Sequence, residues 1–444
     1  MEQMRTAARR LGIRIKDDLK NSQALRNAHA LALQTASWLS PNPVTAQCRA
    51  VTAFQRSESP QLWKWMGAAR ENREGAEANT APPPSPSTAR YRGYLTQQSQ
   101  LTRSIILKAP GEHGERGVLM VQFEYNWYRL LHGIGDLDAL AKQYDILWGT
   151  SWSATDYLLL KAILAKTTGE MYVLPSHTSE AAKLQAFHPR IQCPPVLSAS
   201  DWVNPKFFAP KPHAERSTDI LMVANWAPFK RHFELFSALR EMPADLRVTL
   251  IGQTEAQYTA EHIRQMMRLY RVPQQVTVLE SLPIDEVTRH QCDSKVALIL
   301  SRREGSCVAA VEALFAGAAL GMRRGAHVGS VQYINEETGA LISGTQTAAD
   351  LMALLERSAT LRPHEWAARN ISCHVSLGKL NTFLRERAVA RNLPWTMDLA
   401  PFHWRPYPTY SEPADLNRLQ LVYDDLHRRF PEVFSHDLGT TSRR

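Results

Sequence analysis

The feature that most constrains the fold of this chain is a regular alternation of short apolar runs and helical patterns between residues 219 and 357. The apolar runs occupy 219–225, 246–252, 276–280, 295–301, 318–322 and 339–343. Helical spacing fills the intervals, at 230–241, 256–271, 284–291, 307–317 and about 346–357. Short apolar runs bounded by turns are typical of strands buried on both faces. The alternation therefore predicts a doubly wound parallel sheet.

A second alternating region precedes this one in the chain. Strands are expected at 104–108, 118–123, 145–148, 171–174 and 195–198, with helices at 127–142, 154–165 and 179–187. The proline-bearing segment 201–217 separates the two regions. We therefore expect an α/β protein with two Rossmann-like, doubly wound parallel-sheet domains. A central cleft is expected between them, because ligands of open parallel sheets bind at the carboxyl ends of the strands.

Composition shifts suggest where the domains end. Residues 72–90 are rich in Pro, Ala, Ser and Thr, as in a flexible or polyproline-like linker. The predicted domains are a partly helical N-terminal extension with linker, a first α/β domain, a second α/β domain and a helical tail that packs back across the lobes. Their respective ranges are 1–95, 96–209, 210–375 and 376–444.

The basic character of the chain is concentrated in its first hundred residues, which carry a net charge of +7 out of +9 for the whole chain. Apolar residues such as Leu11, Ile15 and Leu19 recur there among lysines and arginines. This pattern predicts a helix that lies on an anionic surface or packs on a neighbouring element. A solvated basic tail is the remaining interpretation.

Composition also bears on the compartment. The five cysteines are scattered and show no metal-ligand spacing, which fits a reducing environment. The sequence contains no run of eighteen apolar residues, and its first twenty residues are charged throughout. We therefore expect a cytoplasmic protein without a metal centre, with peripheral attachment to a membrane as an added hypothesis.

The most informative stretch runs from Ser301 to Leu314. It follows a buried strand, turns at Gly305, offers Ser306 as a helix N-cap and continues as a helix. A helix that opens at the carboxyl end of a parallel strand binds anions, because its first N–H groups have no intrahelical partner and its dipole favours negative charge. The pattern therefore predicts a phosphate site.

Four residues of this stretch have expected roles in such a site. The amides of Ser306 and Cys307 could hold a phosphate. Glu312, inside the helix, could accept hydrogen bonds from two ribose hydroxyls. Glu304, beyond the helix start, would face the group carried by the distal phosphate. The alternative is that both glutamates are solvated surface residues.

Two other loops should lie at the same edge of the sheet. Lys230 and Arg231 follow the first strand of the second domain and could offset charge on a diphosphate. Gly252 follows the next strand and allows a close backbone approach. The alternatives are a solvated Lys-Arg pair and an ordinary turn glycine.

The segment Glu304 to Ala313, EGSCVAAVEA, resembles the Glu-(seven residues)-Glu motif of retaining GT-B-fold glycosyltransferases, the glycosyl transferases group 1 or family 4-like proteins. The following ALFAGAALGM resembles the small-residue stretch of that family, and TGALIS at 338–343 resembles the segment before its last helix. The resemblance covers roughly residues 218–360, with three signals in the right order.

The resemblance implies a retaining hexosyltransferase-type enzyme that uses a nucleotide-sugar donor and needs no metal or other cofactor. It implies that Glu304 and Lys230 are catalytic. The donor-binding positions are then Glu312, Ser306, Cys307, Gly305, Asn225, Arg231 and Gly252. Asn225 stands where the family usually has an arginine.

The first domain would bind the acceptor, which is a saccharide, a lipid-linked molecule or a small molecule. Its glycine-bearing segment 108–117 is a further candidate for approaching the donor phosphates.

Two other functions stay open at this stage. One is a catalytically degenerate protein that binds a nucleotide sugar without turnover, which the missing arginine favours. The other is a basic binder of an anionic membrane surface or of nucleic acid. Nucleic acid is not the expected partner, because basic residues do not interleave with aromatic ones and no known nucleic-acid motif is found.

Overall fold

The computed structural model describes residues 2–74, 91, 93, 104–150, 155–405 and 407–434. The chain forms two compact units. Unit 1 combines Met1–Asn21 with Ser200–Val375, and unit 2 combines Ser22–Ala199 with Ser376–Arg444. The N-terminal extension is therefore divided between the two units. Most of the predicted linker, residues 75–90, lies outside the described residues.

Unit 1 is built on a six-stranded sheet in the order β11-β10-β9-β6-β7-β8, and all its neighbouring strands are parallel. The strands are β6 (Thr218–Val223), β7 (Val248–Gly252), β8 (Val276–Glu280), β9 (Ser294–Ile299), β10 (Ala319–Arg323) and β11 (Gly339–Ile342). Strand order reverses between β6 and β9, as in a doubly wound fold. All six predicted strands of this region are present.

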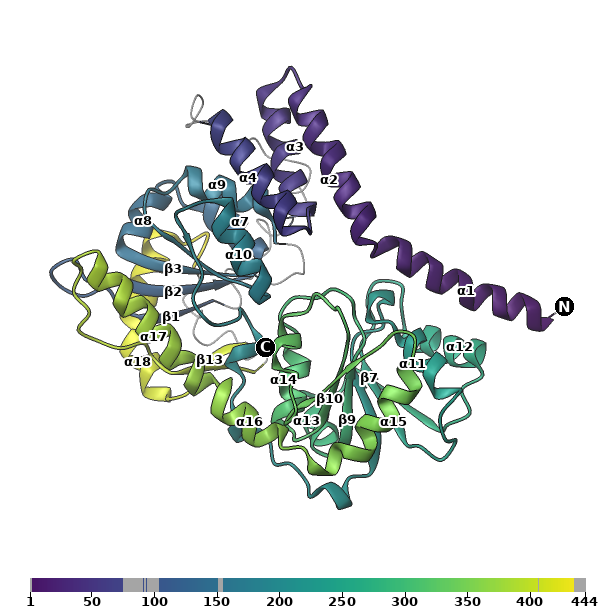
Figure 1. Cartoon of the computed structure of the whole chain (residues 1–444). Helices are drawn as coiled ribbons and strands as arrows, with labels where there is room; N and C mark the ends of the chain where they lie inside the picture. Colours follow the sequence, from purple (N-terminus) through teal and green to yellow (C-terminus); the bar gives the residue numbers. More distant parts are fainter. Residues whose placement is uncertain are drawn as a thin grey trace. The chain divides into compact units, whose positions relative to one another are not determined.

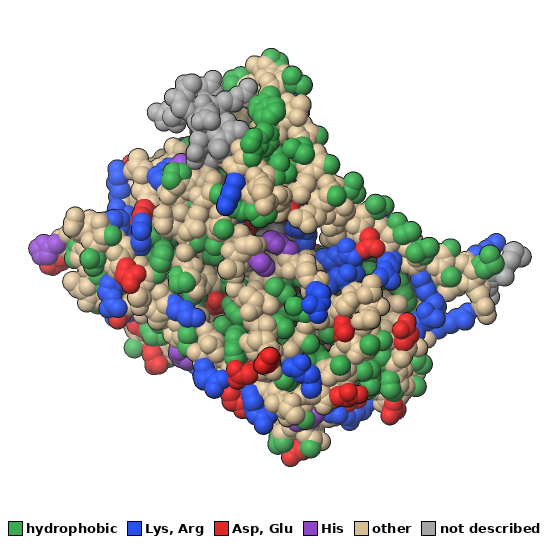
Figure 2. All heavy atoms as spheres, in the orientation of Figure 1, with side chains coloured by type: hydrophobic (Ala, Val, Ile, Leu, Met, Phe, Trp, Pro, Cys, Tyr) green, Lys and Arg blue, Asp and Glu red, His purple; other side chains and the backbone are tan. Residues whose placement is uncertain are grey.

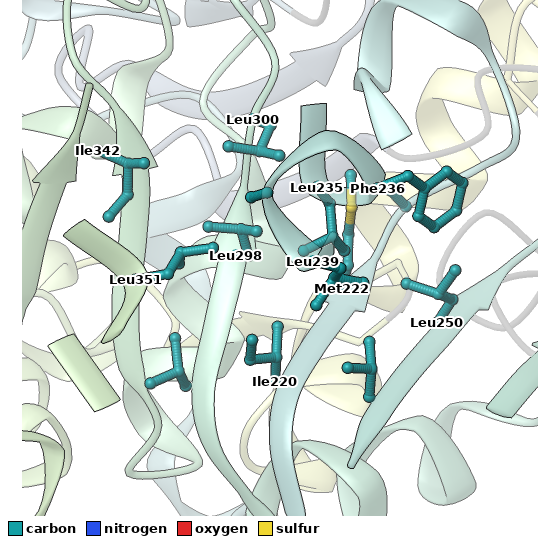
Figure 3. Packing of buried hydrophobic residues seen from close by; sticks show 14 of the residues in the cluster. Ile220, Met222, Leu235, Phe236, Leu239, Leu250, Leu298, Leu300, Ile342 and Leu351 are labelled. Atoms are coloured by element: carbon teal, nitrogen blue, oxygen red, sulfur yellow. The ribbon is translucent and has the colours of Figure 1, made fainter. Parts of the chain in front are cut away.

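Helices follow these strands as expected (Figure 1). They are α11 (His232–Leu239), α12 (Ala260–Tyr270), α13 (Ile284–Cys292), α14 (Val308–Phe315), α15 (Thr347–Arg357) and α16 (Pro363–Asn370). Figure 3 shows their packing: Leu235 and Leu239 of α11 face Met222, and Leu351 of α15 lies beside Leu298. Each fully buried side chain of this kind stabilises the unit by about 1.5–3 kcal/mol.

The first helix, α1 (Glu2–Lys20), belongs to unit 1. Ile13 packs against the core of that unit. Arg10 donates two hydrogen bonds to the Leu269 carbonyl, at 2.9 and 2.6 Å, and lies over the Tyr270 ring at 5.4 Å. The helix therefore packs on a neighbouring element, one of the two arrangements expected for it.

Unit 2 contains a five-stranded sheet whose strands follow chain order. They are β1 (Ser104–Lys108), β2 (Gly117–Gln122), β3 (Tyr144–Gly149), β4 (Met171–Leu174) and β5 (Ile191–Gln192). β1 is antiparallel to β2, and the other pairs are parallel. The α/β class with parallel sheets and a helical N-terminal region is thus confirmed, and the reversal of strand order is seen in the sheet of unit 1.

One predicted strand of unit 2 is wrong. Residues 196–198 are buried and Pro195 is exposed, but all four lie outside the sheet, and the short strand β5 precedes them. The physical reason is the dipeptide Pro194-Pro195, since neither residue has an N–H group to donate to a neighbouring strand.

Helices surround this sheet (Figure 1). They are α2 (Gln23–Trp38), α3 (Pro43–Arg56), α4 (Pro60–Glu74), α7 (Glu124–Gly133), α8 (Leu137–Gln143), α9 (Tyr157–Ala165), α10 (Thr178–Phe187), α17 (Cys373–Ala390) and α18 (Pro413–Arg429), with a hairpin β12 (Phe402–Trp404) and β13 (Pro408–Tyr410). The single helix expected at 127–142 is two helices, because Asp136 caps a new start at Leu137. The tail helix α18 packs on β1, where the Tyr423 hydroxyl accepts a hydrogen bond from Ile106 at 3.1 Å. Among the described residues, no helix is long and apolar enough to cross a bilayer.

Candidate functional site

The loop between β9 and α14 carries the residues on which the predicted site depends. Its backbone is braced by the segment 327–330: the Glu304 amide donates to the His327 carbonyl at 3.1 Å, and the Gly329 amide donates to the Gly305 carbonyl at 2.9 Å. A loop tied along its length by backbone hydrogen bonds holds a defined shape. The solvated-turn interpretation of Glu304 therefore does not fit the structure.

The start of α14 differs from the prediction in one respect. The expected N-cap, Ser306, is not the capping residue. Its hydroxyl accepts a hydrogen bond from the Ser200 amide at 3.2 Å instead. Cys307 is the N-cap, in the left-handed conformation with φ 60°, and its side chain makes no capping hydrogen bond. The side chain of the N-cap therefore does not cap the first-turn N–H groups. These groups and the helix dipole favour an anion at this end of α14.

The two residues predicted to be catalytic meet in the structure. Lys230 Nζ lies 2.6 Å from Glu304 Oε2, and the two side chains are 15% and 11% exposed. The other carboxylate oxygen, Oε1, is buried and makes no hydrogen bond to any residue in the described ranges. Since buried polar atoms are nearly always hydrogen-bonded, this oxygen is suited to accept a hydrogen bond from a ligand hydroxyl.

The electrostatics of this pair follow from its surroundings. Burial disfavours the charge on Lys230, but the negative charge of Glu304 outweighs it and raises the lysine pKa above its ordinary value. Burial, with the Glu304 charge adding to it, raises the pKa of Cys307 to about 12. Lys230 is therefore an ammonium ion at neutral pH and Cys307 is a thiol. This makes Cys307 a poor nucleophile.

Arg231 is bound by two carboxylates of its own chain. It is 3% exposed, lies in the left-handed conformation with φ 63°, and forms ion pairs with Asp17 of α1 and Glu234 of α11. Burial lowers its pKa to about 10. The next residue, His232, is buried and neutral, since burial and the Lys230 charge lower its pKa to about 3. The charge of Arg231 is thus already neutralised, and its predicted donor contact stays a prediction.

Glu312 lies inside α14 as expected, one turn after the helix begins at Val308. Its side chain is half-buried, and Oε2 accepts a hydrogen bond from Gln291 Nε2 on α13 at 3.3 Å. A carboxylate held in this way keeps capacity for a further donor. The expected ribose contact is compatible with this arrangement and stays a prediction.

The two remaining predicted residues contact their own chain. Asn225 Nδ2 donates to Glu255 Oε2 at 3.1 Å. A methyl group at Gly252 would lie 2.3 Å from the Ala224 carbonyl oxygen and 2.8 Å from the Trp226 ring. The close approach at Gly252 is thus made by the chain's own loop after β6, and the predicted donor contact of Gly252 stays a prediction.

Two contributions to this region were not anticipated from the sequence. Asp17 reaches Arg231 from a helix more than two hundred residues away, and Ser200 supplies an amide to Ser306. Neither has a local signal, because each depends on which distant segment packs there.

Comparison with known proteins bears on the same region. Residues 203–369 match the family model described as Glycosyl transferases group 1, which confirms the resemblance predicted for residues 218–360. No curated protein sequence matches the chain.

Several solved structures show a remote likeness. A sucrose-phosphate synthase from Thermosynechococcus elongatus is 18% identical, with 62% of this chain and 74% of that chain covered and a TM-score of 0.49. A G117R mutant of TarM from S. aureus is 13% identical, with 64% of each chain covered and a TM-score of 0.46. Anabaena Alr3699/HepE in complex with UDP is 11% identical, with 62% and 78% covered and a TM-score of 0.45. These likenesses are too distant to carry an argument about activity.

Proposed function

We propose that this chain, whose residues 203–369 match the model of the glycosyl transferases group 1 family, transfers a sugar from a nucleotide-sugar donor to an acceptor with retention of anomeric configuration. The observation that carries the proposal is the state of Glu304. One of its carboxylate oxygens holds Lys230 at 2.6 Å, and the other is buried without a hydrogen bond to a described residue. A hexosyl donor has hydroxyl groups that match this free acceptor.

The chemistry follows from the charges that change during transfer. As the bond between the anomeric carbon and the diphosphate breaks, negative charge grows on the leaving phosphate. The amides of Ser306 and Cys307 and the Lys230 ammonium would stabilise that charge. A phosphate oxygen of the leaving group can take the proton of the acceptor hydroxyl, so the reaction needs no side-chain base and, we propose, no metal or cofactor.

Lys230 has a partner in both states of this scheme. Without a donor it pairs with Glu304. With a donor it would contact the diphosphate, and Glu304 would then be free for the sugar. Glu312 would take the ribose hydroxyls beside Gln291. The acceptor, a saccharide, a lipid-linked molecule or a small molecule, is assigned by this proposal to unit 2.

A thermal-shift panel of nucleotides and nucleotide sugars tests the donor. A ligand present at a hundred times its Kd stabilises the native state by about 2.7 kcal/mol. We expect one class of nucleotide sugar to raise the Tm and to be hydrolysed slowly. Glu304→Ala and Lys230→Ala should each lower the rate of that hydrolysis at least about a hundredfold.

A matched control is available in the same sheet. Lys295 pairs with the Asp219 carboxylate at 2.8 Å, near the amino ends of the strands. Lys295→Met should lower the Tm but leave the ligand-induced shift unchanged. Donor hydrolysis that stays close to the wild-type rate in Lys230→Ala, or no response to any nucleotide sugar, would contradict the proposal.

The panel also separates the enzyme from a degenerate binding protein. Asn225 donates to Glu255 and Arg231 is neutralised by Asp17 and Glu234, so Lys230 is left as the main cation for a diphosphate. A nucleotide sugar that raises the Tm and is never hydrolysed or transferred would favour the degenerate protein.

A second candidate function, peripheral attachment to an anionic lipid surface, is favoured by α1. Its exposed apolar residues are Met4, Leu11, Ile15 and Leu19, with exposed fractions of 77%, 58%, 48% and 58%. At 3.6 residues per turn this stripe lies roughly opposite the side on which Arg10 and Asp17 contact unit 1. An apolar stripe directed away from the protein core is the reverse of the usual arrangement in a globular helix.

Basic residues border the stripe. Arg5, Lys16 and Lys20 are exposed, and each follows an apolar stripe residue, so each lies about 100° around the helix from the stripe and on the same side of it. In Figure 2, hydrophobic side chains follow one edge of α1, and Lys and Arg side chains gather beside it. Apolar insertion combined with basic contacts is how surface helices bind anionic lipid.

Vesicle sedimentation tests this attachment. Leu11→Ser, Ile15→Ser and Leu19→Ser combined should reduce binding to vesicles of anionic phospholipid at least tenfold. The control replaces exposed apolar residues elsewhere with Ser, at Val389, Met397 and Leu421, and should bind like the wild type. Equal binding by the two triple variants would contradict the proposal, as would preferential retention of the wild type on DNA.

A further inference from the structure

One carboxylate of α1 joins the two loops that carry the candidate catalytic pair. Asp17 Oδ2 forms an ion pair with Arg231 Nη1 and lies 3.2 Å from Arg302 Nε, a charge contact in which that nitrogen makes no hydrogen bond to a described residue. Arg231 directly follows Lys230, and Arg302 precedes Glu304 by two residues. The loop after β6 and the loop after β9 are therefore linked twice, directly by Lys230 and Glu304 and again through Asp17.

Both arginines are held in ways that restrict their loops. Arg231 is 3% exposed and left-handed, and it also pairs with Glu234. A left-handed arginine is strained, so its conformation depends on its surroundings. The Arg302 carbonyl accepts a hydrogen bond from the His327 amide at 2.7 Å, within the bracing that shapes the Glu304 loop. Moving either guanidinium therefore moves backbone adjacent to a candidate catalytic residue.

Hydrogen bonds from α1 to unit 1 hold Asp17 in place. One turn and two turns before it, Arg14 donates to the Gly344 carbonyl at 3.1 Å and Arg10 donates to the Leu269 carbonyl. The side chain of Asp17 is 13% exposed, whereas that of its neighbour Asp18 is 49% exposed. Within the part of the chain that the structure describes, the ion pair of Asp18 is with Arg302 of the second loop, so Asp18 does not link the two loops. Substitutions of Asp17 and Asp18 can therefore be compared directly, with Asp18 as the control.

We propose that Asp17 is a positioning residue for the transfer reaction: it fixes the two loops relative to each other, so that Lys230 and Glu304 converge on the donor. It acts through Arg231 and Arg302 and does not touch the substrate itself. The kinetic part of this inference rests on the proposed function, whereas the structural part does not.

The kinetic experiment compares Asp17→Asn, Asp17→Glu and Asp18→Asn. Asp17→Asn should lower kcat roughly 10- to 100-fold, because small displacements of reacting groups have effects of this order, with less than a threefold change in donor KM. Asp17→Glu should recover most of the loss by restoring a carboxylate. Asp18→Asn should lower kcat less than threefold. Equal effects of Asp17→Asn and Asp18→Asn, or a loss that only follows the fraction of unfolded protein, would overturn the inference.

Hydrogen exchange provides a readout that needs no donor. Asp17→Asn should speed amide exchange at least fivefold in both 228–233 and 302–307, whereas Asp18→Asn should affect at most the second segment. Unchanged exchange in 228–233 for Asp17→Asn would overturn the inference. If the wild type binds no nucleotide sugar, the proposed function fails alone, and the exchange experiment still decides whether Asp17 links the loops.

Discussion

The Lys108–Glu115 pair of unit 2 and the Lys230–Glu304 pair of unit 1 are alike in residue type and in their place beside a strand end. Lys108 Nζ lies 2.5 Å from Glu115 Oε1, with side chains 1% and 3% exposed, and the ammonium lies 3.8 Å from the centre of the Trp395 ring. The distance in the other pair is 2.6 Å, with side chains 15% and 11% exposed. The N–O distances and the exposed fractions of the side chains therefore do not explain by themselves why the Lys230–Glu304 pair is the better functional candidate.

The pairs differ in how many hydrogen bonds their carboxylates receive. Both oxygens of Glu115 are engaged, because Oε1 also accepts from the Thr396 amide at 2.8 Å and Oε2 accepts from the Thr396 hydroxyl at 2.5 Å. Glu304 has one engaged oxygen and one buried oxygen without a hydrogen bond in the described residues. Lys108 Nζ itself makes no hydrogen bond to a described residue, so the pair is called saturated here only because both of its carboxylate oxygens accept hydrogen bonds. A carboxylate with both oxygens engaged stabilises the fold, and one with a free oxygen keeps capacity for a ligand. The segment 108–117 carries this ion pair, and its expected approach to the donor phosphates stays a prediction.

The largest expected effect is the loss of protein stability when the saturated pair is broken. Lys108→Met leaves Glu115 buried without its cation, and we expect it to lower the free energy of unfolding by about 3–5 kcal/mol. Urea denaturation measures this change. Lys230→Met should cost clearly less, because Glu304 is more exposed. Equal destabilisation by the two variants would remove the distinction between the pairs.

The next effect is on turnover. Lys230→Met removes the cation that faces the leaving diphosphate, and we expect kcat to fall about 10²- to 10³-fold, the loss typical for one charge-stabilising group. The measurement is initial-rate kinetics with the donor found in the ligand panel. Lys295→Met is the control and should keep kcat within about twofold, after correction for its unfolded fraction.

A smaller effect concerns ligand recognition. Glu304→Gln keeps the shape of the side chain but weakens it as an acceptor. We expect nucleotide-sugar binding to weaken roughly tenfold, about 1.4 kcal/mol, and binding of the corresponding nucleoside diphosphate to change little. Isothermal titration calorimetry compares the two ligands. An equal loss for both would show that Glu304 does not contact the sugar.

The smallest effect is the acid dependence of the saturated pair. Burial disfavours the Glu115 carboxylate, but the Lys108 ammonium and hydrogen bonds from Thr396 outweigh it and lower its pKa from 4.5 to about 2. Because the folded pKa lies below the unfolded one, the pair stabilises the protein fully above the unfolded pKa and loses this contribution as pH falls from 4.5 toward 2. Between pH 7 and pH 4 the loss is about 1 kcal/mol.

Glu115→Gln tests whether Glu115 causes this acid dependence of stability. The variant should be less stable at pH 7 and should show a shallower decline in unfolding free energy between pH 5 and pH 3, measured by urea denaturation at each pH. If the unfolding free energy of the variant declines as steeply as that of the wild type between pH 5 and pH 3, other carboxyl groups cause the decline.

Much of the fold could be predicted from local patterns. The strands at 171–174 and 276–280 were predicted with their observed ends, because an apolar run bounded by polar residues is a local signal. The short helix break at Asp136 and the loss of the strand at 195–198 were missed, although Asp136 and Pro194-Pro195 are visible in the sequence. In both places a single residue or dipeptide ended the predicted element although the periodic pattern continued: Asp136 caps a new helix, and the two prolines have no N–H groups to donate.

The candidate site divides in the same way. The sequence predicted that Lys230 and Glu304 lie at the same edge of the sheet, because both follow parallel strands. The structure adds that their strands, β6 and β9, are neighbours. Ser306 was expected to cap α14, and the cap is Cys307, because the Ser306 hydroxyl is taken by the Ser200 amide. That competition depends on a segment about a hundred residues away and has no local signature.

The sequence by itself determined the α/β class, the parallel sheet of unit 1 and the loops that bear Glu304 and Lys230, because strand and helix periodicities and turn residues act over a few neighbouring positions. Only the tertiary structure decided how the charges are shared. It packed α1 on unit 1 and brought Asp17 between Arg231 and Arg302, and it left one oxygen of Glu304 without a hydrogen bond to any described residue. Ion pairs between distant segments depend on packing in three dimensions, and residue order along the chain does not specify which acid reaches which base.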